Sequence, residues 1–339
     1  MEHPDILTLL KKELSGDPEK DHALLQAAAE KYAQHPENRE ILRAIGRLMY
    51  AVLPEDKKRD ADKVFAIESN AVRATLLQVR NRIQAKEFDE AEKLINQVHP
   101  DEDLFASDAV TEYFSFNNYL EEVYYREKTG CKKNIHPPPF PFNEYYNYRV
   151  FLLFEKRRFD EAETFIEAAL KRNPLYAHML FEKSEIAKSR KDWRAFFDTS
   201  LLAFPMLYKR PDLARFFRNI GFYFVERSLW EEAFAAYFTS MYWHPTNLAE
   251  GEIQFILQKS GQDLRKQAAE KCLELLGKHS IPLRADPLWS KIAWHLGRDA
   301  FEEKVYDLAL FFFTVVHDLV GDEEAAERCR ECEKHLKKA

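Results

Sequence analysis

The stretch FDEAETFIEAALKRNP, from Phe159 to Pro174, carries the pattern that decides the fold. A large residue opens it, acidic residues follow, Ala162 is small, and an apolar residue stands four positions later. Stretches of the same kind occur at Phe88–Ile95, Leu229–Pro245 and Val305–Val316. Their alanines, at positions 91, 162, 233 and 309, are 162 − 91 = 71, 233 − 162 = 71 and 309 − 233 = 76 residues apart. Half of each interval, 35.5 to 38 residues, indicates a repeated unit made of two helices.

A partner helix is expected before each of these stretches. Gly221 stands twelve residues before Ala233, and Gly297 stands twelve residues before Ala309. Small residues at these points let two helices approach closely, while large apolar residues nearby fill the neighbouring gaps. Pro174 follows Ala162 by twelve residues, at a point where a helix must stop. The sequence therefore predicts successive helix–turn–helix pairs.

This pattern resembles the tetratricopeptide repeat (TPR), a helix–turn–helix unit of about 34 residues. The resemblance covers roughly residues 21–320 and is best at Asn219–Pro245 and Asn143–Pro174. It implies an all-α fold, a TPR-like α-solenoid of about eight helix pairs that forms a right-handed superhelix. The chain departs from the family pattern in its 71- and 76-residue intervals, and at Phe196, where Ala is usual.

The domain organisation follows from the repeats and from one interruption in them. We expect N-terminal helical repeats over 1–128, a Pro-rich connection over 129–142, TPR-like repeats over 143–320 and a charged capping helix over 321–339. The end of a solenoid needs such a polar helix because no further repeat covers its last face.

Individual helices can also be predicted in the less regular first half. The pattern predicts two separate helices over 57–69 and 71–85, and a helical segment over 103–128 that the asparagines of FNN can divide. Asn143 is expected to cap a helix over 144–156.

The interruption is NIHPPPFPF, residues 134–142, with four prolines within five positions. Proline prevents a helix from continuing, so this segment is expected to be an extended connection between two blocks of repeats. Phe140 and Phe142 favour packing onto adjacent helices. Two other interpretations remain open: the segment lies in the groove and competes with ligand, or it is exposed as a ligand for another protein.

Composition excludes several classes of protein. The 339 residues are 46% hydrophobic and carry a net charge of −7, with 50 basic residues against 57 acidic ones. This balance argues against nucleic-acid binding, which usually needs a basic surface. No apolar window is long enough to span a membrane. Four cysteines do not form a disulfide framework, and we expect a soluble protein in the cytoplasm.

No catalytic or cofactor motif stands out in the sequence. There is no phosphate-binding glycine loop, no nucleophile elbow and no HExxH pair. CRECEKH, residues 329–335, has metal-binding residue types, but structural zinc usually takes four ligands from two separated pairs. We therefore expect no enzyme activity, no cofactor and no metal.

The resemblance also implies where a ligand binds, because the first helix of each TPR unit lines a concave groove. Transferred to this sequence, the groove positions carry polar, aromatic and basic residues. They include Asn147, Tyr148, Phe151, Phe181, Arg215, Arg218, Asn219, Phe222, Trp294 and Arg298. Arg215, Arg218 and Asn219 are similar in type to the residues with which some TPR domains hold a peptide's C-terminal carboxylate. The alternative is that these arginines pair with surface carboxylates such as Asp212 and Glu226.

These observations favour a non-enzymatic scaffold or adaptor that binds a protein or peptide in the groove over residues 144–302. One alternative is a self-associating scaffold, suggested by the aromatic stretches FFFTVV and YFTSMYW. Another is a regulatory repeat protein that senses a peptide. A third is an enzyme or an RNA-binding repeat protein with a local basic patch around Lys209 and Arg215. The sequence does not identify the partner, the pathway or the oligomeric state.

Overall fold

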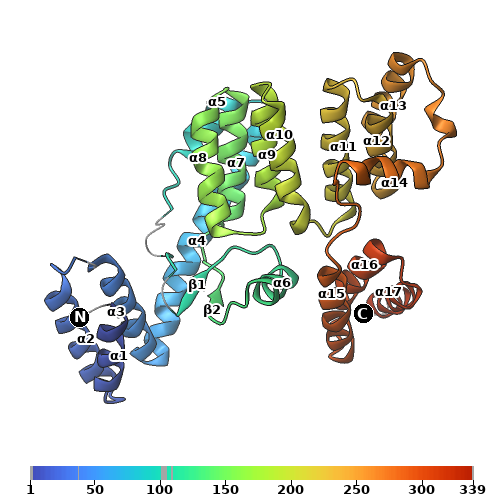
Figure 1. Ribbon diagram of the computed structural model, residues 1–339. Coiled ribbons are helices and arrows are strands. Elements are labelled where there is room, and N and C mark those ends of the chain that lie inside the picture. The colour runs from blue at the N-terminus through green and yellow to red at the C-terminus, as the bar shows by residue number, and fades with distance from the viewer. Residues whose placement is uncertain (1–2, 37, 101–104, 108–109, 338–339) are drawn as a thin grey trace. The chain divides into compact units, whose positions relative to one another are not determined.

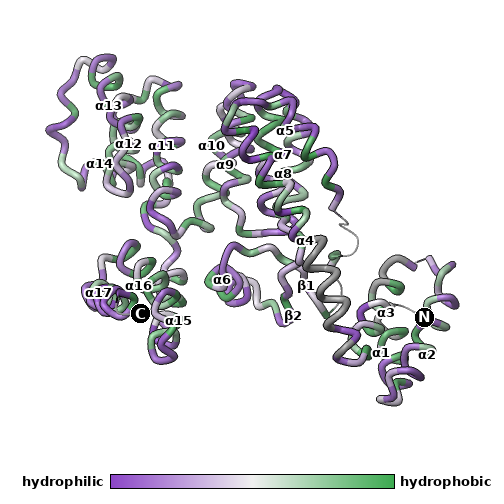
Figure 2. Tube along the Cα trace, turned by 180° about the vertical axis from the view of Figure 1, so that it is seen from behind, coloured by the Kyte–Doolittle hydropathy of each residue, from purple (hydrophilic) through white to green (hydrophobic). Residues whose placement is uncertain are grey.

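Helices follow one another along almost the whole chain in the computed structural model, which describes residues 3–36, 38–100, 105–107 and 110–337 (Figure 1). Within these ranges the fold is all-α, with seventeen α-helices, two 3₁₀ turns and two three-residue strands. Hydrophobic and hydrophilic residues alternate along the helices (Figure 2), as expected for helices that bury one face.

The chain divides into two compact units. The first comprises Met1–Ser115 and Lys132–Leu152, and the second Phe116–Cys131 and Leu153–Ala339. The domain boundaries expected from the sequence stay a prediction.

The first unit contains the early helices and both strands. Its elements are α1 (His3–Glu13), α2 (Pro18–Tyr32), α3 (Asn38–Val52), α4 (Glu55–Gln84), α5 (Phe88–Ile95), β1 (Thr111–Tyr113), β2 (Asn134–His136) and most of α7 (Phe142–Glu155). β1 pairs with β2 in parallel, with Glu112 opposite Ile135. Ile6, Leu25, Ile41 and Ile45 form a buried cluster that joins α1, α2 and α3.

The second unit contains the later helices and the inserted helix α6. Its elements are α6 (Tyr119–Thr129), α8 (Phe159–Arg172), α9 (Ala177–Ser189), α10 (Trp193–Ala203), α11 (Arg210–Glu226), α12 (Trp230–Trp243), α13 (Asn247–Ser260), α14 (Ala269–Lys278), α15 (Pro287–Glu302), α16 (Tyr306–Val320) and α17 (Glu323–Leu336). One hydrophobic core runs from α9 to α14 and contains Phe217 and Phe234. A second core joins α6 to α15, α16 and α17.

The repeats share one turn geometry. The residues with a positive φ include Lys86, Arg157, Lys191, Ser228 and Lys304. Each stands five positions before the repeat's small-residue position, namely Ala91, Ala162, Phe196, Ala233 and Ala309. The N–H of the residue that follows each positive-φ residue donates to the carbonyl five residues earlier, as in Leu229 N–H to Phe224 O at 3.0 Å. This is the Schellman arrangement of a helix C-terminus, and its recurrence in one register confirms the repeat.

Close helix packing occurs at the glycines of two repeats. A Cβ added at Gly221 would lie 2.6 Å from the ring of Tyr237, and one at Gly297 would lie 2.9 Å from the ring of Phe313. These rings stand four residues beyond Ala233 and Ala309. The glycines therefore make room for an aromatic ring rather than for the alanine of the facing helix.

Two expectations for the first half were wrong. The chain forms one helix, α4, from Glu55 to Gln84, because no proline or glycine separates the two predicted helices. The segment predicted as helical over 103–128 contains β1, and its helix α6 begins only at Tyr119. Asn118 accepts the Glu121 N–H at 3.2 Å and so caps that helix. Residues 101–104 and 108–109 lie outside the described residues.

The Pro-rich segment packs through its aromatic residues. Phe142 is fully buried, and the ring of Phe140 lies 4.6 Å from that of Phe142 and 5.6 Å from that of Tyr145. The predicted packing is therefore confirmed. Asn143 does not precede the helix as a cap, because α7 already begins at Phe142; its side-chain amide donates to the carbonyl of Ser115 instead.

Helix α6 is attached to α15 by an aromatic stack and several polar contacts. The rings of Tyr124 and Trp289 are 3.6 Å apart and parallel within 3°. Tyr124 Oη donates to Asp286 Oδ2 at 3.0 Å, and Lys128 Nζ donates to the same oxygen at 2.6 Å. Tyr208 Oη donates to Glu121 Oε1 at 2.9 Å. A helix that lies between the α4–α5 hairpin and the later repeats thus completes the core of the last ones.

Candidate functional site

Helices α9 and α11 are the first helices of two consecutive hairpins, and their side chains contact one another in a row that we call the ladder. Arg215 Nη2 donates to Glu182 Oε1 at 3.0 Å, and its guanidinium lies 4.7 Å from the ring centroid of Phe181. His178 approaches both partners, with Nδ1 at 3.5 Å from Arg215 Nη1 and Nε2 at 3.8 Å from Glu182 Oε1. Burial lowers the pKa of His178; Glu182 opposes that shift, and Arg215 adds to it. Arg215 is therefore fully engaged within the protein.

Arg218, one turn further along α11, is not engaged. Its side chain is half-buried, and its Nη1 is buried without an acceptor among the described residues. Burial lowers the pKa of Arg218, and the positive charge of Arg215 lowers it further. A buried charged donor without a partner is costly, so Arg218 carries an uncompensated positive charge on this face.

Tyr237 of α12 is subject to charges from α11 and from α13. Its ring packs on Gly221, and its side chain is 3% exposed. Burial raises the pKa of Tyr237, the charge of Glu252 raises it further, and Arg218 opposes the shift. Arg218 on α11 and Glu252 on α13 are thus both within electrostatic range of one phenol.

The part of α13 around Glu252 exposes apolar side chains. Leu248 is 67% exposed and Phe255 is 40% exposed. Their spacing from Glu252, four residues before it and three after it, places all three on one side of the helix. Gly251 is exposed as well, and a Cβ added there would meet nothing within 4 Å. This side of α13 offers an apolar surface with an open position at its centre.

Phe222 extends the ladder by one turn. Lys188 Nζ lies 4.1 Å from its ring centroid, a cation–π geometry. The ring also contacts Phe196, at 5.7 Å between centroids. Lys188 in turn lies 3.6 Å from Glu185, so this cation has partners within the protein.

Two predicted groove residues lie inside the unit. Asn219 is 7% exposed, and its Nδ2 donates to Ser184 Oγ at 3.3 Å and to Ser200 Oγ at 3.2 Å. Phe181 is 1% exposed and lies beneath Arg215. Both residues position the ladder and present almost no surface of their own.

The predicted residues of α15 lie on another pair of helices. Trp294 makes an edge-to-face contact with Phe313 of α16, at 5.6 Å between ring centroids. Arg298 is exposed and forms no hydrogen bond or ion pair within the described part of the chain. No contact joins these residues to Arg215 or Arg218 among the described side chains.

The remaining predicted residues belong to the first unit. Tyr148 Oη donates to Glu144 Oε1 at 3.1 Å, and burial together with that carboxylate raises the pKa of Tyr148 to about 12. Phe151 contacts the edge of Phe88 at 5.9 Å between ring centroids. Asn147 is half-buried on the same helix. One continuous groove over residues 144–302 stays a prediction.

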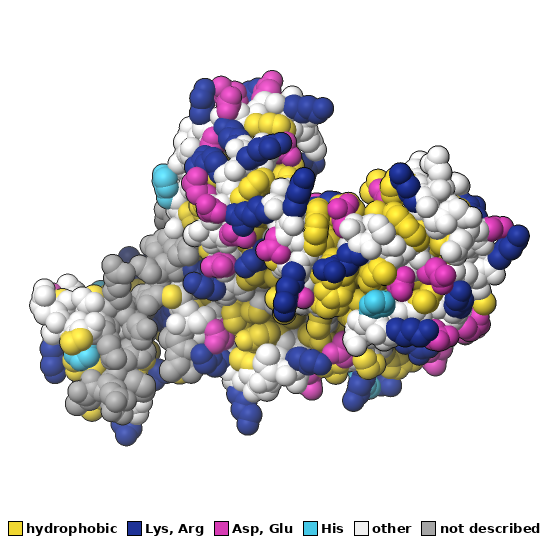
Figure 3. Space-filling model, turned by 45° about the horizontal axis from the view of Figure 1, so that its top comes forward, with side chains coloured by type: hydrophobic (Ala, Val, Ile, Leu, Met, Phe, Trp, Pro, Cys, Tyr) yellow, Lys and Arg dark blue, Asp and Glu magenta, His cyan; other side chains and the backbone are white. Residues whose placement is uncertain are grey.

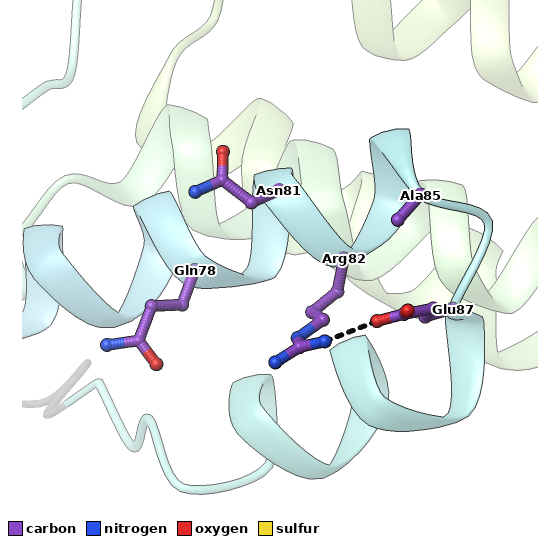
Figure 4. A pocket seen from close by; sticks show the side chains of 5 residues that line it. All are labelled: Gln78, Asn81, Arg82, Ala85 and Glu87. Atoms are coloured by element: carbon purple, nitrogen blue, oxygen red, sulfur yellow. Dashed lines mark hydrogen bonds and ion pairs between the residues drawn. The ribbon is translucent and has the colours of Figure 1, made fainter.

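A small hollow in the first unit lies between α4 and α5 (Figure 4). It measures about 200 Å³ and is lined by Gln78, Asn81, Arg82, Ala85 and Glu87. Arg82 is paired with Glu87 across it. Because its only cation is already neutralised and its walls are exposed, the hollow is a weaker candidate than the ladder.

Two other kinds of site are absent from the described residues. These residues contain no group of three His, Cys, Asp or Glu residues that is arranged to hold a metal ion, and no helix among them is long and apolar enough to cross a membrane. Cys332 is fully buried, and Cys329 Sγ lies 3.7 Å from Thr314 Oγ1. On the face drawn in Figure 3, cationic and anionic side chains are interspersed, with hydrophobic patches between them.

The sequence pointed to Arg215, Arg218 and Phe222, but it missed Tyr237 and the apolar side of α13. The position of Tyr237, four residues after Ala233 and opposite Gly221, was the available signal. Leu248 and Phe255 had no such signal, because isolated apolar residues in a helix are usually buried.

Comparison with solved structures gives two similar chains. One comes from the functional characterization of Pseudomonas aeruginosa pilF. It is 12% identical, the match spans 77% of this chain and 98% of that chain, and the TM-score is 0.40. The other is the crystal structure of the P58(IPK) TPR domain; it is 14% identical, covers 99% of this chain and 98% of its own, and has a TM-score of 0.22. No family model and no curated protein matches the chain.

The chain is TPR-like. The decisive observation is its own recurring helix-ending turn, five residues before the small-residue position in five hairpins.

Proposed function

We propose that this TPR-like chain is a non-enzymatic scaffold or adaptor that binds a protein or peptide on the first-helix face of α9, α11 and α13. The observation that supports it best is the half-buried guanidinium of Arg218, whose Nη1 has no acceptor in the described protein. Helical-repeat proteins use such faces as extended binding surfaces. A cytoplasmic location remains part of the proposal.

Pre-organisation would provide the affinity. Phe181 and Asn219 are buried beneath the face, and the Arg215–Glu182 pair fixes the neighbouring side chains. Side chains that are held in place before binding lose little conformational entropy when a partner arrives. The binding free energy can then come from contacts that the free protein leaves incomplete.

Affinity capture with two arginine variants tests this proposal. Wild type, Arg218→Gln and the control Arg194→Gln are used as bait, and captured proteins are repurified and titrated individually. Arg194 is 90% exposed and pairs only loosely, at 3.6 Å, with Asp198. We expect a partner that binds wild type and Arg194→Gln equally but binds Arg218→Gln weakly. A partner that binds all three equally contradicts the assignment of the face.

Self-association is a second candidate because α12 exposes aromatic residues. Phe238 is 40% exposed and Tyr242 is 71% exposed, and their four-residue spacing places them on one side of the helix. Light scattering over a concentration series tests this alternative. If a dimer forms in wild type and is lost in Phe238→Ser/Tyr242→Ser, the scaffold associates with itself; a monomer at all concentrations eliminates the idea.

A further inference from the structure

Three successive hairpins of the second unit each carry an unpaired cation in the turn between their two helices. Arg157 lies between α7 and α8, Lys191 between α9 and α10, and Arg227 between α11 and α12. All three residues are exposed, and their side chains form no hydrogen bond or ion pair within the described part of the chain. We call these residues the turn cations.

Other cations in the same turns are paired. Arg158, next to Arg157, donates through Nε to Glu161 Oε1 at 2.7 Å. Arg190, next to Lys191, donates through Nη1 to Glu163 Oε2 at 2.8 Å and through Nη2 to a carboxylate oxygen of Asp160. The first two turns therefore neutralise one cation each and leave the adjacent cation without a counter-charge.

Side-chain contacts place the three turns next to one another. The guanidinium of Arg190 lies 5.8 Å from the ring centroid of Phe159, the first residue of α8. Trp193, the first residue of α10, contacts the ring of Phe222 near the end of α11, at 5.8 Å between centroids. Phe222 stands five residues before Arg227. The turn cations thus form a row along one edge of the second unit.

The fold itself does not require two of these side chains. Arg157 and Lys191 adopt φ angles of 56° and 58°, in the left-handed region that favours glycine. A cation near a helix C-terminus is stabilised by the helix dipole, but Arg158 and Arg190 already supply that charge. A second long cationic side chain in a conformation that disfavours side chains points to a role outside the fold.

The aromatic rings beside the row are engaged within the protein. Lys188 Nζ lies 4.1 Å from the ring centroid of Phe222. The ring of Tyr223 stacks on that of Phe197 at 4.2 Å, and the guanidinium of Arg227 lies 4.6 Å from its centroid. Proteins that bind single-stranded nucleic acid stack bases on aromatic faces, so these covered rings do not favour such a ligand.

Acidic residues interrupt the positive charge of the row. Glu155 and Glu226 are exposed and stand two residues and one residue before a turn cation. A continuous phosphate backbone or an anionic membrane surface would meet these carboxylates as well as the cations. Separate carboxylates on a flexible chain can pair with the cations and avoid the acidic residues between them.

We propose that the turn cations form a second interaction surface, separate from the first-helix face, that binds an extended acidic segment of a partner protein. Each cation pairs with one carboxylate of the segment. Helices that pack directly are about 8–10 Å apart, and an extended chain advances about 10 Å in three residues. The spacing of the turns therefore matches acidic side chains three residues apart.

Three synthetic peptides test this inference without knowledge of the natural partner. Each has fifteen residues, an acetylated N-terminus, an amidated C-terminus and the same fluorescent label. The spaced peptide has Glu at every third position and Gly or Ser elsewhere. The neutral peptide has Gln in place of each Glu, and the block peptide has its five Glu residues in succession. Fluorescence anisotropy with the full chain measures binding in about 20 mM salt, where exposed charges are little screened.

We expect wild type to bind the spaced peptide about tenfold more tightly than the neutral one, because three exposed ion pairs act together. The block peptide should bind less tightly than the spaced one. The variant Arg157→Gln/Lys191→Gln/Arg227→Gln should lose the preference for Glu. Each single substitution should weaken binding of the spaced peptide by about two- to threefold, which keeps the test valid if the triple variant does not fold.

A matched control removes three other charges from the second unit. Lys171, Lys304 and Lys334 are exposed and unpaired among the described residues, and Lys304 occupies the same position in the turn between α15 and α16. Lys171→Gln/Lys304→Gln/Lys334→Gln should bind the spaced peptide as wild type does. Circular dichroism confirms that each variant is folded.

Three outcomes overturn the inference: equal binding of the spaced and neutral peptides by wild type, an equal loss of binding in the control variant, or tighter binding of the block peptide. Tighter binding of a single-stranded oligonucleotide or of anionic vesicles, lost in the turn-cation variant, would also overturn it. Failure here leaves the proposed function untouched, because the first-helix face is tested separately by capture with Arg218→Gln.

Discussion

Arg218 illustrates how one residue can oppose the stability of its own fold. Its guanidinium is half-buried, lies near the charge of Arg215 and leaves Nη1 without an acceptor in the described protein. Most substitutions destabilise a protein, but the removal of an uncompensated charge acts in the opposite direction.

We expect Arg218→Met to raise the free energy of unfolding by about 1 kcal/mol, because a long apolar side chain keeps the packing and removes the charge. Thermal unfolding at pH 7 measures it. The control Arg215→Met should have the opposite effect, since it leaves the carboxylate of Glu182 without its partner. A fall in stability for Arg218→Met would show that the guanidinium has a partner in solution.

Gly221 permits a second residue-scale prediction. Gly221→Ala places a Cβ 2.6 Å from the buried ring of Tyr237, and we expect a loss of about 1–3 kcal/mol from overpacking. Gly251→Ala, also in a helix, has free space around its Cβ and should gain about 0.5–1 kcal/mol from its helix propensity. Chemical denaturation of both variants measures the contrast; equal effects would contradict the packing.

Asp286 provides a pH-dependent prediction. Burial acts to raise its pKa, but bonds from Lys128, the Leu288 N–H and Tyr124 outweigh it, so the pKa lies below its ordinary value of 3.8. A carboxyl group whose pKa is lowered by folding contributes stability above its ordinary pKa and loses it as the pH falls through the folded value. The contribution of Asp286 should therefore be complete above about pH 5 and be lost progressively as the pH falls further.

Asp286→Asn is the matched variant, because Asn also caps a helix N-terminus but does not ionise. Wild type should melt at a higher temperature than Asp286→Asn at pH 6, and the difference should shrink as the pH falls below 4. A constant difference between pH 6 and pH 2.5 would mean that the charge of Asp286 does not act on α6.

At the scale of elements, α6 is a helix supplied from outside the repeats. Tyr124→Ala removes a ring that is 2% exposed and stacked on Trp289, and should cost about 3 kcal/mol. Hydrogen exchange should then accelerate in α15, α16 and α17. Tyr119→Ala in the same helix removes a residue that is 56% exposed and should leave exchange unchanged. Unchanged protection in Tyr124→Ala would contradict a supporting role for α6.

The sequence predicted regular elements well and irregular ones poorly. Ala162 and Gly221 marked the hairpins because small residues must occur where helices touch. The turns were not predicted, because Lys191 and Ser228 adopt positive φ without being glycine. The asparagines of FNN did mark the start of α6 at Tyr119. Residues 111–113 were mispredicted as helical because their partner strand, Asn134–His136, lies further along the chain.

The candidate site was only partly predictable from the repeat pattern. Register placed Arg215 and Arg218 on one helix face, but only the structure shows that Arg215 is satisfied by Glu182 and Arg218 is not. The pairing depends on residues 33 positions apart, which a repeat pattern does not specify.

At the scale of the whole molecule, each unit has a core of its own. Ile45 is fully buried in the first unit, and Phe217 is fully buried in the second. Domains with separate cores usually unfold as separate cooperative transitions. We expect Ile45→Ala to lower one calorimetric transition and Phe217→Ala the other, by about 2–5 kcal/mol each. If both variants shift one common transition, the chain unfolds as a single cooperative unit.

The attachment of α6 to α15 also affects how the chain is made. Tyr124 and Asp286 are 162 residues apart, a span that a ribosome translates in roughly 8–30 s at about 5–20 residues per second. Throughout that interval Tyr124 is already part of the nascent chain while Trp289 has not yet been synthesised. The second unit can close only when the last repeats emerge, so a nascent chain that is released early keeps an exposed aromatic helix for chaperones to recognise.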